Sequence, residues 1–208
     1  MTLTTLWTMT KLKRDIVFAT RNAGKINEVR EFFANSSFNI LSLDDIGVDI
    51  HVVEDGTTFE ENAQKKAREV CCACRMMVLA DDSGLAIDAF DGAPGVDSAN
   101  FLGTDTPYPV RNAKILKMLA DVPEARRTAH FVCVIAIARP GQEIVTERAE
   151  IHGKIAYKIA GEGGFGYDPI FFLTQYGVTM AQMDMAQKNE ISHRGQALKL
   201  VRNRLEKL

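Results

Sequence analysis

A glycine-rich stretch around residue 165 carries the clearest chemical signal in this chain. Residues 163–169 read Gly-Gly-Phe-Gly-Tyr-Asp-Pro, and Ser192, His193 and Arg194 follow in the same C-terminal region. Glycine lets a backbone approach a flat or anionic ligand closely, and an aromatic ring beside it can stack on a base. Ser192 is a suitable helix N-cap, and cations in a first helical turn need an anionic or acceptor-rich partner. The pattern predicts a pocket for a purine with a keto oxygen at position 6, since an amino group there would leave buried donors unpaired.

The aromatic residues of this stretch also allow a second interpretation. Phe165 and Tyr167 can both pack in a core, and for Tyr167 a core position and a ligand contact are equally compatible with the sequence. Pro169 fixes the exit of the chain into the apolar run at 170–172, which predicts a strand. Lys188 lies close in sequence to His193 and adds a further cation to the region.

A strand-to-helix junction at residues 20–25 carries the second signal. It reads Thr-Arg-Asn-Ala-Gly-Lys and follows an apolar run. Unpaired backbone N–H groups at a helix start favour phosphate, and Lys25 adds a full positive charge there. The junction is not a P-loop, because Ala19 replaces the first glycine of that motif and Ile26 replaces its hydroxyl residue. By spacing alone, a phosphate-binding site and a solvated lysine beside a capping Asn22 are equally good interpretations of this junction.

Acidic residues follow two other segments of the chain. Asp81 and Asp82 come directly after an apolar run, whereas Glu54 lies in the sequence Glu54-Asp55-Gly56. Carboxylates from separate loops suit Mg²⁺, which keeps several waters and binds substrate phosphates, and a carboxylate can also activate a water. Side chains alternate along a strand, so we expect only one of the two aspartates to face the site. Asx-type turns are the alternative; they are the better interpretation of Glu54-Asp55 alone, whereas the adjacent buried strand favours function for the aspartates.

Hydrophobic periodicity predicts the elements that must hold these residues. Alternation and short apolar runs predict strands, whereas apolar residues at three- and four-residue steps predict helices. The expected strands are residues 15–20, 39–43, 76–80, 85–90, 131–138, 143–151 and 170–172, with a glycine turn at 81–84. The expected helices are residues 22–35, 57–74, 110–119 and one after Ser192 that carries Ala197, Val201, Leu205 and Leu208 on one stripe. This order predicts an α/β fold: a mixed twisted sheet flanked by helices, with two lobes around a central nucleotide-binding cleft.

Composition and charge narrow the class of protein. The chain has 208 residues, of which 46% are hydrophobic and 25% charged, and a formal net charge of −2. This balance argues against a nucleic-acid polymer or a membrane as partner, and no apolar run approaches the ~20 residues of a membrane span. Cys71 and Cys74 have zinc-knuckle spacing, but no second pair follows, so packing cysteines in the reducing cytoplasm are the better interpretation. We expect a disordered tail over residues 1–14 and one two-lobed domain over 15–208.

Several stretches, in their order along the chain, resemble those of one known family. They are residues 20–25, 54–63, 80–85, 163–171 and 192–198. Their sequences are similar to those of the inosine/xanthosine triphosphate pyrophosphatases, which clear deaminated purine nucleotides. The resemblance implies a two-lobed mixed-sheet fold, a homodimer and Mg²⁺ as cofactor. It also implies hydrolysis of ITP, dITP and XTP between the α- and β-phosphates, which gives a nucleoside monophosphate and pyrophosphate.

The resemblance implies roles for individual residues as well. It makes Asp82 the general base and a metal ligand, with Glu54 as a second metal-associated acid and Ser83 as a substrate contact. It matches Thr20, Asn22 and Lys25 to triphosphate-binding positions, and the residues of the same stretch that we also expect to bind the substrate are Arg21, Ala23 and Gly24. Those that it assigns to the base loop and the remaining substrate contacts are Phe165, which stacks on the purine, Gly166, Tyr167, Asp168, Lys188, His193 and Arg194.

The chain departs from the family pattern at two positions. Asp97 stands where an aromatic residue is usual, and Asn100 stands where an arginine is usual. The lost cation and the added anion would weaken phosphate affinity or alter subunit contacts, but neither change touches Asp82 or Lys25, so we expect activity to survive. A non-catalytic purine nucleotide sensor on the same scaffold is the alternative to an enzyme. A nucleotide kinase is disfavoured by the incomplete P-loop.

Overall fold

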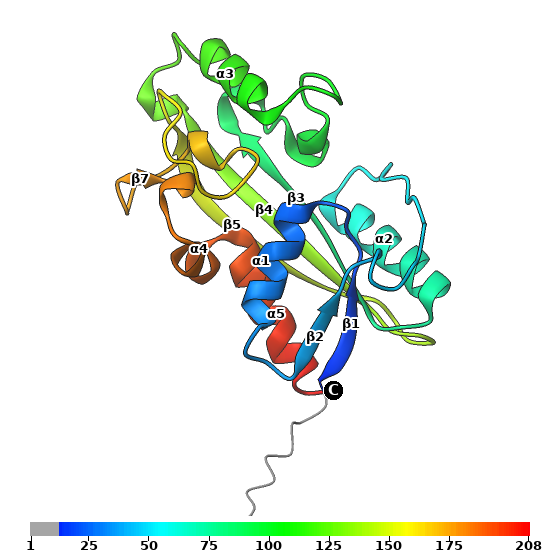
Figure 1. Ribbon diagram of the computed structural model, residues 1–208. Coiled ribbons are helices and arrows are strands. Elements are labelled where there is room, and N and C mark those ends of the chain that lie inside the picture. The colour runs from blue at the N-terminus through cyan, green and yellow to red at the C-terminus, as the bar shows by residue number, and fades with distance from the viewer. Residues whose placement is uncertain (1–12) are drawn as a thin grey trace, which may run out of the picture.

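A seven-stranded mixed sheet runs through the whole molecule (Figure 1). The computed structural model describes residues 13–208; residues 1–12, which hold most of the expected tail, lie outside the described part. The strand order is β2-β1-β3-β4-β5-β6-β7, in which β1 is parallel to β2 and β3 and the other neighbours are antiparallel. The strands are β1 (Arg14–Phe18), β2 (Phe38–Leu41), β3 (Val78–Ile87), β4 (Thr128–Ala138), β5 (Val145–Ile155), β6 (Phe171–Leu173) and β7 (Val178–Thr179).

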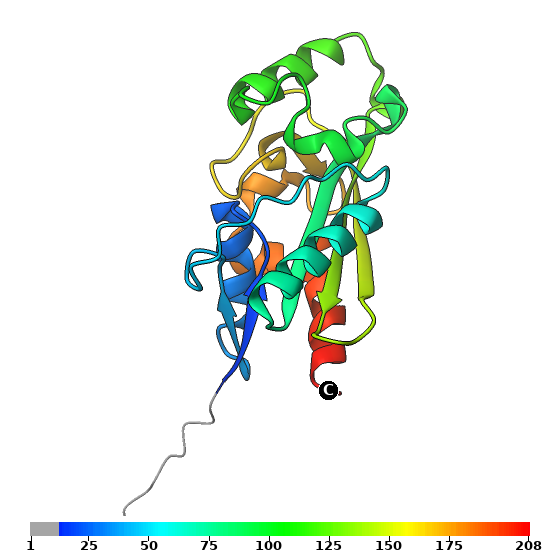
Figure 2. The same ribbon diagram turned by 90° about the vertical axis from the view of Figure 1, so that its right-hand side faces the viewer.

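Helices cover both faces of the sheet and one of its ends (Figures 1 and 2). Helix α1 (Ala23–Phe33) and helix α5 (His193–Leu205) share a core cluster with one face of β1, β3 and β4. Helix α2 (Phe59–Cys74) shares a second cluster with the opposite face. Helix α3 (Tyr108–Met118) lies at the far end of the sheet, and helix α4 (Met185–Ile191) packs beside α5.

The long strands β3, β4 and β5 join two lobes. Their first or last halves belong to the clusters under α1, α2 and α5, whereas Leu85, Phe131 and Ile151 belong to a third cluster with α3. That third cluster also takes Tyr167 and Phe171, so the chain around the glycine-rich stretch is part of the α3 lobe. The predicted α/β class, with a mixed sheet flanked by helices and a two-lobed arrangement, is confirmed. The division into a tail over 1–14 and one domain over 15–208 stays a prediction, although β1 begins at Arg14.

Helix starts follow the capping residues that the sequence supplies. The Asn22 side chain accepts a hydrogen bond from the Lys25 N–H, Thr58 accepts from Glu61, and Ser192 accepts from Gly195. Each bond satisfies a backbone donor that the first helical turn would otherwise leave unpaired. These caps fix where α1, α2 and α5 begin, and α1 and α5 begin directly beside the residues of the candidate site.

The prediction of a glycine turn at residues 81–84 is wrong. Strand β3 continues without a break from Val78 to Ile87, and every residue of it is paired with β4. Gly84 is needed for a close approach: a Cβ at this position would lie 2.3 Å from the Gly95 carbonyl oxygen and 2.4 Å from Ser98 Oγ. A glycine inside a strand can mark such a contact as readily as a turn. Asp81 and Asp82 therefore lie in the middle of a rigid central strand.

Smaller differences concern element ends and one helix. Residues 88–90 form a short 3-10 helix rather than the end of a strand. Helix α4 is not among the expected helices; its start is fixed by a capping box between Asp184 and Gln187. Leu208 lies beyond α5 and is exposed, so it is not part of the apolar stripe, unlike Ala197, Val201 and Leu205.

Candidate active site

A cavity of about 340 Å³ opens between the two lobes. Lys25, Asp82 and Phe165, which come from separate predicted motifs, all line it. The predicted site residues that line the cavity are Thr20, Arg21, Asn22, Lys25, Glu54, Asp82, Ser83, Phe165, Gly166, Tyr167, Asp168, Lys188, His193 and Arg194. Ala23 and Gly24 are not among the lining residues. We call the part around Lys25, Glu54, Lys66 and Asp82 the charged end, and the part around Phe131, Phe165, Tyr167 and His193 the aromatic end.

The two aspartates of β3 point to opposite faces of the sheet, as strand alternation predicts. Asp82 lines the cavity, whereas Asp81 is fully buried on the other face. Asp81 forms ion pairs with Lys25 Nζ at 3.0 Å and Arg194 Nη2 at 3.1 Å. Burial alone would raise the pKa of Asp81, but the nearby Lys25 and Arg194 outweigh it and hold the pKa well below its usual range. Asp81 is thus a permanent buried anion that anchors two cations at the edge of the cavity.

Asp82 has a different environment. Its Oδ2 accepts a hydrogen bond from Asn62 Nδ2 of α2 at 3.0 Å, and burial raises its pKa to about 6 despite the nearby Lys66 and Lys25. A carboxylate with a pKa near the working pH can accept a proton in a reaction and release it again. The Asn62 side chain also accepts from the Gly56 N–H at 2.8 Å. One buried amide therefore connects Asp82 to the segment that carries Glu54.

Lys66 is a cavity residue that the sequence analysis missed. Its Nζ lies 2.5 Å from Glu54 Oε2, and its side chain is mostly buried. Asn62 and Lys66 are four residues apart on α2, so they lie on the same side of the helix and next to its buried stripe. In the sequence, the signal that could have identified Lys66 was this pair of polar residues, Asn62 and Lys66, four positions apart on a predicted helix.

The donors at the charged end fit Mg²⁺. The Glu54 and Asp82 carboxylates are close enough that the charge on Glu54 raises the Asp82 pKa. No group of three His, Cys, Asp or Glu side chains that could hold a metal occurs among residues 13–208. Magnesium does not require such a group, because it binds through one or two carboxylates, several waters and the phosphates of a substrate.

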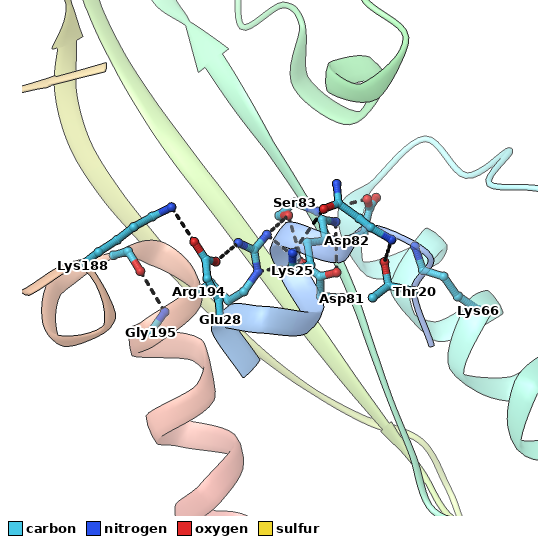
Figure 3. A network of polar contacts seen from close by, with 12 residues as sticks. Thr20, Lys25, Glu28, Lys66, Asp81, Asp82, Ser83, Lys188, Arg194 and Gly195 are labelled. Carbon is cyan, nitrogen blue, oxygen red and sulfur yellow. Dashed lines mark hydrogen bonds and ion pairs between the residues drawn. The ribbon is translucent and has the colours of Figure 1, made fainter. Parts of the chain in front are cut away.

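A chain of buried charges adjoins the cavity, and Asp168, Lys188 and Arg194 of this chain also line it (Figure 3). Arg194 pairs with Glu28 and with Asp81, and Glu28 also pairs with Lys188, which in turn pairs with Asp168 at 2.6 Å. Burial would raise the pKa of Glu28, but Arg194 and Lys188 lower it below its usual value. Removing one member would leave another charge buried without a partner, which is strongly destabilising. This network joins α1, β3, α4 and α5 into one support.

Glu28 was also absent from the predicted site. It lies three residues after Lys25 on α1, which by sequence suggests a pair within the helix. The structure instead pairs Lys25 with Asp81 and Glu28 with Arg194, 166 residues away along the chain. The Lys25 side chain is only 15% exposed, so the interpretation as a solvated lysine is wrong.

Phe165 spans the two ends of the cavity. Its ring lies over Gly24, where a Cβ would be only 2.6 Å from Phe165 Cδ1. Lys188 Nζ lies 4.9 Å and the Arg194 guanidinium carbon 5.5 Å from the ring centroid, within the range of cation–π contacts. Gly24 therefore contributes through its lack of a side chain, which lets the aromatic loop rest on the start of α1.

The polar side chains next to Phe165 form hydrogen bonds and an ion pair within the protein. Tyr167 is 3% exposed, and its hydroxyl donates a hydrogen bond to the Ser98 carbonyl oxygen at 2.7 Å. Asp168 Oδ2 accepts from the Phe165 N–H at 2.8 Å and from Lys188. Tyr167 is therefore a core residue whose surface reaches the cavity, and Asp168 fixes the shape of the loop.

His193 is buried and neutral rather than a cation that awaits a ligand. Its ring stacks on Phe131, with ring centroids 4.6 Å apart and an interplanar angle of 11°. Burial and the nearby Arg194 and Lys188 lower its pKa well below the usual value. Its Nδ1 finds no hydrogen-bond partner within the described part of the chain. The imidazole can thus offer a ligand one donor and one acceptor without a charge.

The two positions that depart from the family pattern both line the cavity. Asp97 and Asn100 are exposed and lie in or directly after the 3-10 helix Gly95–Ala99, opposite the glycine-rich loop. The main chain of this segment is held by Arg111, whose guanidinium donates to the Ser98, Ala99 and Gly103 carbonyl oxygens. The wall is therefore built without the side chains of Asp97 and Asn100.

All four cysteines are free, and Cys71 and Cys133 are buried. Within residues 13–208, none of the helices combines the length and apolar character needed to cross a membrane.

Comparisons with known proteins agree with this geometry. A family model described as the Ham1 family matches residues 16–204. A dITP/XTP pyrophosphatase of Geobacter sulfurreducens is 46% identical over 190 residues, which cover 91% of this chain and 96% of the relative. A dITP/XTP pyrophosphatase of Oceanobacillus iheyensis is 47% identical over 186 residues, which cover 89% and 94% of the two chains.

Solved structures are similar over nearly the whole chain as well. The structure of the Staphylococcus aureus Ham1 protein has a TM-score of 0.82 at 38% identity and covers 93% of this chain and 98% of its own. A HAM1 protein from Coxiella burnetii has a TM-score of 0.84 at 36% identity and covers 94% and 100%. The similarity therefore extends over both lobes.

Proposed function

The chain belongs to the Ham1 family, and we propose that it is a Mg²⁺-dependent pyrophosphohydrolase of deaminated purine nucleotides. Its substrates are dITP, ITP and XTP, and its products are the nucleoside monophosphate and pyrophosphate. One observation carries the proposal: Lys25, Asp82 and Phe165 open onto a single cavity. A phosphate-binding cation, a carboxylate of suitable pKa and an aromatic ring are thereby within reach of one nucleotide.

The charged end supplies the chemistry. Asp82, with its pKa raised by burial to about 6, takes the proton from the attacking water, because a base is most effective when its pKa lies near the working pH. Asp82 and Glu54 would hold Mg²⁺, which supplies charge stabilisation at the phosphates and lowers the pKa of a bound water. Lys25 and the N–H groups at the start of α1 bind the triphosphate and stabilise charge that develops during attack. Lys66, paired with Glu54, adds a further cation at this end.

The remaining predicted residues bind the substrate. Arg194 belongs to the buried charge network, and its Nη2 donates to Ser83 Oγ at 2.7 Å. The residues that we assign to the triphosphate are Thr20, Arg21, Asn22, Ala23, Gly24 and Lys25, with Ala23 and Gly24 acting through the backbone. Those that we assign to the base and sugar are Phe165, Gly166, Tyr167, Asp168, Lys188 and His193.

The proposal also covers the cellular location, the oligomeric state and the partners of the enzyme. We assign it to the cytoplasm as a homodimer, with no nucleic-acid polymer and no membrane as partner. The net charge of −2 and the local clustering of cations in the cavity support a small anionic substrate over a polymer. The competing function is a non-catalytic nucleotide sensor. Its motive is that Asp97 and Asn100, which depart from the family pattern, are exposed at the cavity wall.

A substrate panel separates these functions. Purified protein is incubated with ITP, dITP, XTP, ATP and GTP, with Mg²⁺ or with EDTA, and both pyrophosphate and orthophosphate are measured. We expect pyrophosphate from ITP, dITP and XTP, and only when Mg²⁺ is present. Orthophosphate as the sole product would place the cut at the terminal phosphate and contradict the mechanism. Binding without any phosphate release would identify the sensor.

A further inference from the structure

We propose that Asn112 of α3 is a positioning residue for base discrimination: it orients the Gly166–Tyr167 peptide so that the Tyr167 N–H faces position 6 of the purine. This inference rests on the proposed function, because it explains how the same cavity would prefer a 6-keto over a 6-amino purine. Asn112 contacts no nucleotide in this arrangement. It acts through the backbone of the glycine-rich loop.

The evidence begins with an uncommon buried amide. Asn112 is 1% exposed, and its Nδ2 donates a hydrogen bond to the Gly166 carbonyl oxygen at 3.0 Å. Its Oδ1 has no hydrogen-bond partner within the described part of the chain. A buried polar side chain that is only half satisfied is costly, so its retention calls for a reason beyond packing. Gly166 and Tyr167 line the cavity, whereas Asn112 does not, so it holds the loop from behind.

The geometry of the peptide group turns this bond into an orientation. In a planar trans peptide, the carbonyl of Gly166 and the N–H of Tyr167 point in opposite directions. Because the Gly166 carbonyl points to Asn112, which does not line the cavity, the Tyr167 N–H points away from Asn112, and we place it on the cavity side of the loop. Neither this N–H nor that of Gly166 has a hydrogen-bond acceptor among residues 13–208. The cavity wall thus presents a backbone donor without a protein acceptor.

Gly166 makes this orientation possible. Its φ is +68°, in the left-handed region that favours glycine, and a Cβ there would meet nothing closer than Tyr108 at 3.7 Å. The position therefore selects glycine for its backbone angle and not for lack of space. Without Asn112, the Gly166 carbonyl would lose its buried donor. The peptide would then favour this orientation over other orientations by a smaller free energy.

Helix α3 holds the facing wall of the cavity in the same way. Arg111, next to Asn112, donates to the Ser98 and Ala99 carbonyl oxygens, and Tyr167 donates to the Ser98 carbonyl oxygen as well. The spacing between the loop and the 3-10 helix at Gly95–Ala99 is thus set from one helix. A fixed donor between two fixed walls discriminates well, because a purine amino group would face it with another donor and leave both unpaired.

Variants at Asn112 test the inference. Asn112→Asp keeps the shape but places an oxygen against the Gly166 carbonyl, and Asn112→Ala removes the donor. Equilibrium binding of IMP and AMP without metal is measured by calorimetry, together with kcat/KM for ITP and ATP and the thermal unfolding temperature. We expect the preference for inosine over adenosine nucleotides to fall at least about tenfold in both assays. Lys114→Ala, an exposed change on the same helix, should leave the preference unaltered.

The outcomes separate this inference from the proposed function. A folded Asn112 variant with the parental preference would overturn the positioning role, whereas a parent without any preference for inosine nucleotides would overturn the proposed function instead. If the Asn112 variants do not fold, hydrogen exchange measured on the unaltered chain tests the inference instead. The Tyr167 amide should be protected from hydrogen exchange by IMP and not by AMP at equal occupancy; equal protection by the two would contradict the inference.

Discussion

The two ends of the cavity differ in the groups that they offer to a ligand. At the charged end these groups are side chains. At the aromatic end most polar side chains already have partners within the protein, so the backbone offers the free groups. At the charged end, Asp82 comes from β3, Lys66 from α2 and Glu54 from the segment between β2 and α2. Tyr167 and Asp168, in contrast, bond to Ser98, Lys188 and their own loop. A site for a nucleotide needs both kinds of end, because phosphate is bound by charge and a purine is discriminated by shape and by a few fixed donors.

The largest expected effect is at the charged end. Asp82→Asn removes the carboxylate that accepts the proton, so we expect kcat for ITP to fall by about 10² to 10⁴-fold. Because the pKa of Asp82 is raised by burial, its ionised form destabilises the fold above pH 6, and the neutral amide should leave the unfolding temperature at pH 7.5 unchanged or higher. Initial rates of pyrophosphate release and a thermal melt check the two statements. Turnover at the parental rate would show that Asp82 is not the base.

The neighbouring aspartate should behave in the opposite way. Asp81→Asn leaves Lys25 without its buried counter-charge and leaves Arg194 paired with Glu28 but not with a second carboxylate, so we expect the free energy of unfolding to fall by about 3–5 kcal/mol. Urea denaturation without nucleotide measures it. Asp91→Asn, in an exposed turn, is the matched control and should change stability by less than about 0.5 kcal/mol. A loss below about 1 kcal/mol at Asp81 would mean that the network of buried charges adjoining the cavity is not its main support.

The sequence predicts local features of both ends better than the contacts between them. The caps Asn22, Thr58 and Ser192 and the alternation of Asp81 and Asp82 depend on neighbours within a few residues, so they can be inferred from spacing. The turn expected at Gly84 was wrong because the cause of that glycine, the Gly95 carbonyl, belongs to another segment.

Residues that connect distant elements were missed for the same reason. Glu28 and Lys66 read as surface charges of helices, and Asn112 reads as one more polar residue of α3. Their roles depend on partners such as Arg194, which lies 166 residues from Glu28, and periodicity carries no information about these partners. The family resemblance predicted most of the residues that line the cavity. Its assignment of ligand contacts to Tyr167 and Asp168 stays a prediction, and the polar groups of these two residues also bond within the fold.

A smaller change tests the contact that joins the two ends. In Gly24→Ala the new Cβ would lie 2.6 Å from Phe165 Cδ1, so the ring must move away from α1. We expect kcat/KM for ITP to fall about tenfold, chiefly through KM, while the free energy of unfolding is unchanged because alanine favours the helix. Steady-state kinetics and urea denaturation measure the two quantities. An unaltered KM would show that stacking on the base does not depend on where Phe165 rests.

The smallest expected effect concerns pH and the aromatic end. The pKa of His193 is well below 6.5 in the folded chain, because it is buried and faces Arg194, Lys188 and Lys25, with Asp81 opposing them only in part. Below pH 6.5 the unfolded chain binds a proton that the folded chain does not, so stability must fall as the pH falls. Between pH 6.5 and 5.5 this amounts to about 1 kcal/mol.

His193→Gln isolates this contribution. The amide does not titrate, so over the same interval the variant should lose about 1 kcal/mol less than the parent, even if it is less stable at pH 7.5 without the stack on Phe131. Asp82 opposes the trend, because its raised pKa makes the fold gain stability as it is protonated below about pH 6. The comparison of slopes cancels Asp82, which is present in both proteins. Parallel slopes for parent and variant would mean that His193 takes up a proton in the folded chain as readily as in the unfolded chain, and the aromatic end would then carry a cation below about pH 6.5.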